Sequence, residues 1–285
     1  MSSSSNPVFA AGNLAVITGG ASGIGLALAR KCASYNMNVL ICDNNSANLA
    51  SAKEAVKSKA RFETLEMDVS QLEEFGKVKS LVEKEFDGKI SLLALNAGTT
   101  AKGTWGDSAY FQHILSVNLF GVLHGINTLL PLTTASSPSS IIITGSKQGI
   151  TNPPGNPAYN ASKSALKTLA EHLSFDLSKS HPSTSVHLLI PGWTFTGLSG
   201  NAPFGDKKEI PKGAWSGEQV VEFLEKKMAE GKFYVVCPDG DVSESMDRKR
   251  MAWGAGDLVM GRPPLTRWRE EYKAEAEEWM AKQDL

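Results

Sequence analysis

The stretch LAVITGGASGIG, from Leu14 to Gly25, decides the fold that the sequence predicts. It opens with a short apolar run of the kind that forms a strand buried on both faces. Glycines then let the backbone turn sharply, and apolar side chains follow at helical spacing, at Ile24, Leu28 and Cys32. A helix that begins directly after such a turn offers free N–H groups and a positive dipole end to a pyrophosphate. The alternative is a glycine-rich turn that binds no ligand.

The same order of apolar run and amphipathic segment repeats along the chain. Strands that alternate with helices form a parallel sheet with right-handed crossovers. The sequence therefore predicts the α/β class, with a doubly wound sheet of seven parallel strands and helices on both faces. The predicted strands are residues 13–18, 37–43, 61–67, 90–96, 140–144, 184–190 and 233–237, and the predicted helices are 23–35, 70–86, 107–130 and 157–180.

The chain divides into three parts with no internal linker. We predict a flexible N-terminus over residues 1–12 and one dinucleotide-binding and catalytic domain over 13–240, in which residues 195–215 form a loop over the substrate site. The remaining residues, 241–285, are charged but contain three tryptophans. Because three tryptophans are seldom all left in water, we expect a helical extension packed on the same domain.

Composition excludes several classes of protein. The 285 residues carry 29 Lys and Arg against 30 Asp and Glu, a net charge of −1, which gives no electrostatic footprint for nucleic acid or an anionic membrane. There is no signal peptide pattern, and no run approaches the roughly 18 apolar residues of a membrane span. Cys32, Cys42 and Cys237 have no metal-binding or redox spacing. We expect buried free thiols, no metal and a cytoplasmic location.

An acidic residue at the end of the second predicted strand indicates which dinucleotide is bound. Asp43 lies 18 residues after Gly25, where a carboxylate can accept hydrogen bonds from an adenosine ribose and repel a 2′-phosphate. Asn44 and Asn45 are neutral, and the glycine turn contains no Arg or Lys. This pattern favours NAD over NADP. The alternative is an aspartate that only caps a turn.

Small and polar residues follow three other predicted strands. Asp68-Val69 has a carboxylate and a backbone that could contact adenine, and Asn96-Ala97-Gly98 would let a nucleotide lie against the chain. In Pro191-Gly192-Trp193-Thr194-Phe195-Thr196, backbone groups and threonine hydroxyls could hold a carboxamide ring. Each motif alone is weak, because short polar turns after strands are common.

Ser146, Tyr159 and Lys163 form the candidate catalytic group. Tyr159 and Lys163 are four residues apart and so point from one face of one helix. An ammonium beside a phenol lowers the phenol's pKa from about 10, which lets tyrosine exchange a proton with an alcohol or ketone. The hydroxyl of Ser146, after the fifth predicted strand, can hold the substrate oxygen. Alternatively, Tyr159 is a core residue and Lys163 a surface charge.

A buried polar residue is expected at Asn118, inside an otherwise apolar helix. A buried amide needs hydrogen-bond partners. Both a site role and a purely structural hydrogen bond are consistent with the sequence.

Taken in order, these motifs resemble the short-chain dehydrogenase/reductase family over roughly Leu14 to Thr196. Two departures are visible: Leu95 stands where the family often has a second Asn, and the tail beyond Asp241 extends past the family's usual core. The motifs that carry the resemblance are Thr18-Gly19-x-x-x-Gly23-x-Gly25, Asp43, Asn96-Ala97-Gly98, Asn118, Ser146, Tyr159-x-x-x-Lys163 and Pro191-Gly192-x-x-x-Thr196.

The resemblance implies a Rossmann-like domain and assigns a role to each motif. Tyr159 would be the general acid/base, Lys163 would tune its pKa and bind the nicotinamide ribose, Ser146 would orient the substrate oxygen, and Asn118 would hold a water that relays protons from Lys163. It also implies homodimers or homotetramers, with an interface on the helices that begin near Asp107 and Pro157. The residues expected to bind the cofactor are Gly19, Ser22, Gly23, Ile24, Gly25, Asp43, Asp68, Val69, Asn96, Ala97, Gly98, Tyr159, Lys163, Pro191, Gly192, Trp193, Thr194 and Thr196.

The sequence thus predicts an NAD-preferring oxidoreductase that acts on a secondary alcohol or a ketone. Two alternatives stay open: an NADP-dependent ketone reductase, and a non-catalytic dinucleotide-sensing or scaffold protein of the same fold. For the substrate site, Trp193, Phe195, Phe204 and Trp215 suggest an apolar, partly aromatic pocket under the 195–215 loop.

Overall fold

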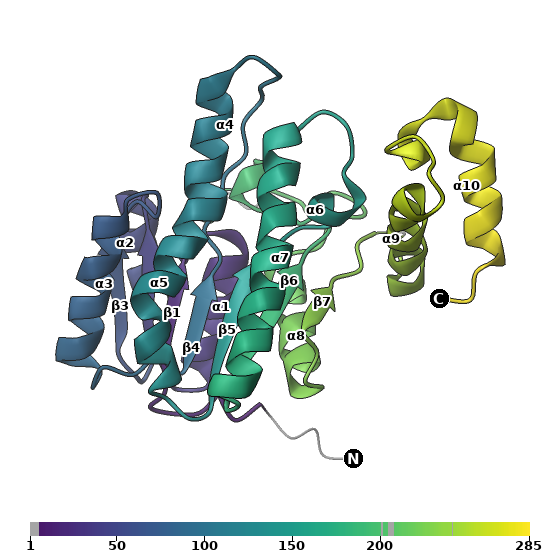
Figure 1. The fold of residues 1–285 in the computed structure, drawn as a ribbon. Coiled ribbons are helices and arrows are strands. Elements are labelled where there is room, and N and C mark those ends of the chain that lie inside the picture. The colour runs from purple at the N-terminus through teal and green to yellow at the C-terminus, as the bar shows by residue number, and fades with distance from the viewer. Residues whose placement is uncertain (1–5, 201, 205–207, 241) are drawn as a thin grey trace.

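A sheet of seven parallel strands forms the centre of the molecule (Figure 1). The computed structural model describes residues 6–200, 202–204, 208–240 and 242–285. The strand order is β3-β2-β1-β4-β5-β6-β7, so the winding direction reverses between β1 and β4. The strands are β1 (Leu14–Thr18), β2 (Asn38–Asp43), β3 (Phe62–Glu66), β4 (Leu92–Leu95), β5 (Ser139–Thr144), β6 (Thr184–Ile190) and β7 (Tyr234–Val236). The prediction of a doubly wound seven-stranded parallel sheet is confirmed.

Helices cover both faces of this sheet because its strands alternate their side chains between two cores. Ala15 and Ile17 of β1 belong to one core, and Leu14 and Val16 belong to the other. The first core is closed by α1 (Gly23–Ser34), α2 (Ser46–Ala55) and α8 (Gly217–Ala229), and the second by α3 (Leu72–Glu85), α5 (Gly121–Thr134) and α7 (Pro157–Ser180). Cys32, Cys42 and Cys237 are buried free thiols in these cores, as expected.

The long helix predicted over residues 107–130 has an irregular centre. It consists of α4 (Ser108–Leu115), a π-helical turn η1 (Ser116–Phe120) and α5, which continues to Thr134. Asn118 lies in the π turn. Such turns are rare in proteins as a whole, but many of those that occur lie at functional sites. The sequence did not predict this turn, nor α2, the short α6 (Gln148–Thr151) or α8.

The segment 108–134 is, by length and composition, apolar enough to cross a membrane, which the sequence reading did not anticipate. In the fold it packs on the sheet, on α3 and on α7, and Val122, Leu129 and Leu132 belong to the second core. No other such helix occurs in the part of the chain that the structure describes.

The beginning of the chain is better anchored than expected. Residues 1–5 lie outside the described residues, but Val8 and Phe9 are 2% and 4% exposed and pack into the first core. This described part of residues 1–12 is therefore packed on the domain, and the flexibility predicted for the N-terminus stays a prediction. Burial of two apolar side chains fixes this segment against the sheet.

The tail forms two helices that lie beside α6, at the β7 edge of the sheet (Figure 1). They are α9 (Glu244–Val259) and α10 (Glu270–Lys282), joined through the 3₁₀ turn η3 (Thr266–Trp268). Their small core is built around Trp253, which is 1% exposed and packs on the ring of Trp279. The Nε1 of Trp268 donates to the carbonyl of Thr151 at 3.0 Å, which holds the tail to α6.

Candidate active site

A cavity of about 720 Å³ opens at the carboxyl ends of the strands, beside the point where the winding direction reverses. This is where open α/β sheets bind their ligands. Of the predicted site residues, all but Gly25 and Asn118 line it: Gly19, Ser22, Gly23, Ile24, Asp43, Asp68, Val69, Asn96, Ala97, Gly98, Ser146, Tyr159, Lys163, Pro191, Gly192, Trp193, Thr194 and Thr196.

The glycine turn shapes one end of this cavity. Gly19 and Gly23 have φ angles of +63° and +49°, which side-chain-bearing residues rarely adopt. Gly25 lies beneath the turn, where a Cβ atom would stand 2.1 Å from the carbonyl oxygen of Gly19. The N-cap of α1, Ser22, makes no side-chain capping hydrogen bond, so the first N–H groups of the helix are free to bind an anion.

Asp43 both caps a turn and faces the cavity. Its Oδ2 accepts a hydrogen bond from the backbone N–H of Ala21 at 3.1 Å, and its Oδ1 accepts one from Asn45 at 3.1 Å. Asn44 lines the cavity beside it. No arginine is among the lining residues of the described chain. The two lysines that line it, Lys147 and Lys163, lie at the opposite end, with Ser146 and Tyr159. Asp43 therefore caps the turn, and its contact with a ribose stays a prediction.

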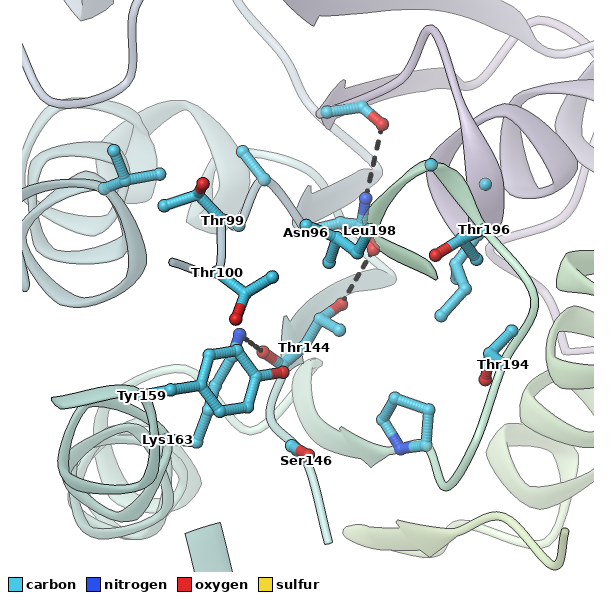
Figure 2. A pocket seen from close by; sticks show the side chains of 18 of the residues that line it. Asn96, Thr99, Thr100, Thr144, Ser146, Tyr159, Lys163, Thr194, Thr196 and Leu198 are labelled. Carbon is cyan, nitrogen blue, oxygen red and sulfur yellow. Dashed lines mark hydrogen bonds between the residues drawn. The ribbon is translucent and has the colours of Figure 1, made fainter. Parts of the chain in front are cut away.

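Asn96 ties the ends of three strands together. Its backbone N–H donates to the hydroxyl of Thr18 at 3.0 Å. Its Oδ1 accepts from the hydroxyl of Thr144 at 3.1 Å (Figure 2). Its Nδ2 also donates to the carbonyl of Thr18. These bonds fix β1, β4 and β5 at the floor of the cavity, and Gly98 after them leaves room for a ligand.

Ser146, Tyr159 and Lys163 meet at the other end of the cavity (Figure 2). Tyr159 and Lys163 lie one turn apart on α7, and the Nζ of Lys163 is 5.8 Å from the centre of the Tyr159 ring. Lys163 is buried and donates to the carbonyl of Thr144 at 2.8 Å. Ser146 follows β5 and lines the same end of the cavity as Tyr159. The alternative in which Lys163 is a surface charge is thereby excluded.

The pKa shifts of this pair differ from the expectation. Burial raises the pKa of Tyr159, and the nearby hydroxyl of Ser146 opposes that rise only in part. Burial also lowers the pKa of Lys163 to about 8. The sequence predicted a phenol pKa lowered by the ammonium. In the protein alone the direction is reversed, because desolvation penalises the charged form of both groups.

Asn118 does not reach the cavity. It is fully buried, its Oδ1 accepts from the backbone N–H of Thr99 at 2.7 Å, and its Nδ2 donates to the Thr99 carbonyl and the Ser162 hydroxyl. Thr99 lines the cavity, so Asn118 fixes the backbone of its wall. The water-holding role that the family resemblance implies stays a prediction.

Three charged residues that the sequence analysis missed join the catalytic end to the tail. The Nζ of Lys147, next to Ser146, lies 2.6 Å from Asp239 Oδ1 and 2.5 Å from Asp247 Oδ2. Asp239 also accepts from the backbone N–H of Trp193 at 2.6 Å. Burial raises the pKa of Asp247, and the ion pair with Lys147 opposes this. No motif in the sequence pairs residues so far apart.

The aromatic lining predicted for the substrate site is largely absent from the described residues. Of the four aromatics, only Trp193 lines the cavity. Phe204 and Trp215 pack instead against the first core, and Trp215 stacks edge-on with Phe223. Residues 201 and 205–207 of the predicted loop lie outside the described residues. The part of that loop that lines the cavity is Thr196 to Ser199.

The geometry agrees with comparisons to known proteins. The family model for short chain dehydrogenases matches residues 13–204. An uncharacterised oxidoreductase of Staphylococcus saprophyticus is 32% identical over 203 residues, which is 69% of this chain and 85% of that protein.

Two solved structures share the fold. A short-chain dehydrogenase/reductase of Burkholderia phymatum in complex with NAD has a TM-score of 0.78 at 25% identity, over 90% of this chain and 97% of that one. An alcohol dehydrogenase of Thermococcus sibiricus, complexed with 5-hydroxy-NADP, has a TM-score of 0.71 at 20% identity over 81% and 98% of the two chains. Within the described ranges, no group of three or more His, Cys, Asp or Glu side chains could hold a metal ion.

Proposed function

The chain belongs to the short-chain dehydrogenase/reductase family of oxidoreductases, and we propose that it moves a hydride between NAD(H) and the carbinol or carbonyl carbon of a secondary alcohol or ketone. The observation that carries the proposal is one cavity with a glycine turn and free helix N–H groups at one end and Ser146, Tyr159 and Lys163 at the other. A dinucleotide laid between these ends would bring its reactive ring to the tyrosine.

The residues present fit a nicotinamide dinucleotide. Gly19 and Gly23 leave open backbone where a pyrophosphate would bind, and Asp43 faces the place of the adenosine ribose. Thr194 and Thr196 line the cavity, Thr196 against Gly23 of the glycine turn, and would hold the carboxamide. When bound, the nicotinamide ring supplies the hydride donor or acceptor. The carboxylate of Asp43 and the lack of arginine in the described lining favour NAD over NADP.

In this proposal the chain's own residues handle the proton. The phenol oxygen of Tyr159 gives a proton to the substrate oxygen during reduction and takes it back during oxidation. Ser146 holds that oxygen in place. Lys163, fixed by the carbonyl of Thr144, brings a group that titrates near neutrality to the tyrosine. Its proton, when present, stabilises the phenolate.

Replacing Tyr159 by Phe tests this mechanism. We expect turnover to fall by about 10²- to 10⁴-fold, because the ring is kept and only the proton-transferring hydroxyl is lost. NADH binding should be unchanged. The measurement is the absorbance of reduced nicotinamide with a panel of secondary alcohols and ketones. Tyr272→Phe, the same chemical change in the tail, is the matched control.

Two outcomes would contradict the proposal. Undiminished activity in the Tyr159→Phe variant would remove the tyrosine from the chemistry. Tight dinucleotide binding with no turnover of any alcohol or ketone in the wild type would favour a sensing or scaffold protein instead.

We also propose that the protein is a cytoplasmic homo-oligomer. Phe120 in η1 and Phe175 on α7 are 48% and 59% exposed, on the two helical segments that the family resemblance implies as the interface. Large exposed apolar side chains mark contact sites. Light scattering should give a mass of at least two chains, and Phe175→Glu should lower it.

A further inference from the structure

A second cavity, of about 310 Å³, lies between α6 and the tail. It is separate from the dinucleotide cavity, and no residue lines both. One wall comes from Ile150 and its neighbours, and the others come from α9 and the turn before α10. Its size is at the lower end of the range, roughly 300–1,000 Å³, in which proteins bind small molecules.

Three arginines line this second cavity, and one of them is already neutralised. The Nε of Arg262 lies 3.1 Å from Asp257 Oδ1, and its Nη2 donates to the carbonyl of Trp253 at 2.9 Å. Its guanidinium also stacks on the Trp253 ring, 3.7 Å from the ring centre. Arg262 is therefore a structural part of the tail's core.

The other two arginines, Arg250 and Arg267, have no ion-pair partner in the described parts of the chain. Both are half-buried. The guanidinium of Arg267 lies 4.4 Å from the centre of the Trp268 ring, so its flat face is covered and its edge remains for hydrogen bonds.

The two free guanidiniums act on each other. Burial and, to a smaller extent, the positive charge of Arg250 lower the pKa of Arg267 to about 10, while the charge of Asp247 opposes both. Two like charges that share a half-buried pocket are unfavourable when, as in the described residues, neither forms an ion pair. An anion between them would remove that cost and form charge-assisted hydrogen bonds.

Apolar side chains make up much of the remaining lining, beside Thr151, Asn152 and the Asp257 carboxylate that is paired with Arg262, and they indicate what kind of anion fits. Ile150, Leu258, Pro264, Leu265 and the ring of Trp268 form the walls. We propose that this second cavity binds a small organic carboxylate, with its carboxylate between Arg250 and Arg267 and its apolar body against these walls. The guanidinium fork matches the geometry of a carboxylate.

Binding there would reach the catalytic segment through α6. Thr151 is the last residue of α6, lines the second cavity and accepts the hydrogen bond from Trp268. The same short helix begins two residues after Ser146. The ligand would thus bridge the tail and the segment that carries the serine, without contact with the dinucleotide cavity.

Titration calorimetry of the full chain with octanoate tests the assignment. We expect saturable binding that Arg250→Gln and Arg267→Gln each weaken by about tenfold or more, the loss expected for a charge-assisted hydrogen bond. Arg248→Gln is the matched control, because Arg248 lies on the same helix but points to solvent beside Glu244. Octanol, which keeps the apolar body but lacks the charge, should bind at least about tenfold more weakly.

Thermal unfolding gives a second readout. Octanoate should raise the unfolding temperature of the wild type and of Arg248→Gln, and should not raise that of the Arg250→Gln, Arg267→Gln double variant. Near-ultraviolet circular dichroism of the tryptophans checks that each variant is folded. If Arg267→Gln does not fold, Arg250→Gln alone decides the outcome, because it removes the charge of a partly exposed side chain that has no ion-pair partner in the described residues.

Three outcomes would overturn the proposal. They are the absence of saturable octanoate binding, equal binding by the wild type and the double variant, and tighter binding of inorganic phosphate than of octanoate. The last would make the second cavity a site for a compact anion, because phosphate has no body to place against the apolar walls.

Discussion

The dinucleotide end of the domain and the tail are built on different principles. At the dinucleotide end, the backbone makes the site: positive φ angles at Gly19 and Gly23 and free N–H groups at the start of α1. In the tail, side chains make the structure, as in the hydrogen bond of 2.9 Å from Trp253 to Thr266. A site formed by the backbone depends on residues that are adjacent in sequence. A structure held by side-chain contacts depends on which residues meet after folding.

Of the changes considered, Gly25→Ala should have the largest effect, because it disrupts the dinucleotide end and leaves the tail intact. The added Cβ would stand 2.1 Å from the Gly19 carbonyl oxygen and 2.7 Å from Asn96 Nδ2, so the turn must open. We expect NADH binding, followed by the fluorescence of the reduced nicotinamide, to fall below detection. The tail, far from this turn, should keep its near-ultraviolet tryptophan signal.

Gly76→Ala is the control for this change. Gly76 lies in α3, and nothing stands within 4 Å of the position its Cβ would take. The substitution should stabilise the protein by about 0.5–1 kcal/mol and leave NADH binding unchanged. Normal NADH affinity in Gly25→Ala would show that the turn does not shape the site.

Trp253→Ala should have the opposite effect to Gly25→Ala, because it destabilises the tail and leaves the dinucleotide end intact. Removing this fully buried ring from between Trp279 and Arg262 should cost about 3–5 kcal/mol of the tail's stability. Hydrogen exchange should then quicken over α9 and α10 while the dinucleotide end stays protected and binds NADH. Trp105→Ala, which removes a tryptophan that is 76% exposed, should change neither. Loss of NADH binding in Trp253→Ala would mean that the two regions fold as one unit.

The same contrast explains what the sequence could predict. The seven strands and the lining of the dinucleotide cavity were predictable because glycines, buried apolar runs and strand-end polar residues are local signals. The cluster of Lys147, Asp239 and Asp247 was not, since its partners are far apart in the chain. The helix α8 did carry a local signal, a capping box in which Ser216 and Gln219 cap each other.

The electrostatics of the site were also beyond the sequence. The spacing of Tyr159 and Lys163 predicted that they are neighbours, and they are. The direction of their pKa shifts depends on how much water reaches them, which no spacing encodes. Likewise, Trp193 lines the cavity while Phe204 and Trp215 pack against the first core, so residue type alone did not place these aromatics.

Lys163→Met tests how strongly the burial of a charged side chain at the Tyr159 end destabilises the domain. Below about pH 8 Lys163 carries its proton in both the folded and the unfolded chain, so the full burial penalty is present. Between about 8 and its ordinary 10.5 only the unfolded chain binds the proton, so wild-type stability rises with pH. The lowering of the Lys163 pKa corresponds to a burial penalty of about 3 kcal/mol, which Lys163→Met removes. The substitution also removes the hydrogen bond to the Thr144 carbonyl, which costs about 1 kcal/mol.

We therefore expect Lys163→Met to be inactive and more stable than the wild type by about 2 kcal/mol near pH 7. Urea unfolding at several pH values measures this, and the advantage should shrink as the pH approaches about 10.5. A variant less stable than the wild type at neutral pH would mean that the lysine is better solvated than its burial indicates.

The smallest effect separates the two roles of Asp43. If its charge faces the ribose and repels a 2′-phosphate, Asp43→Ala should weaken NADH binding and narrow the preference for NADH over NADPH by about tenfold, or 1.4 kcal/mol. Asp43→Asn removes the charge but keeps an oxygen that can accept from Ala21 or Asn45, so it should preserve the turn and still admit NADPH. Fluorescence titration with both dinucleotides measures the ratio. If Asp43→Asn discriminates as the wild type does while Asp43→Ala binds neither dinucleotide well, the carboxylate acts only on the turn. The selectivity of this end would then come from the shape of the backbone around Gly19 and Gly23, with no contribution from the charge of Asp43.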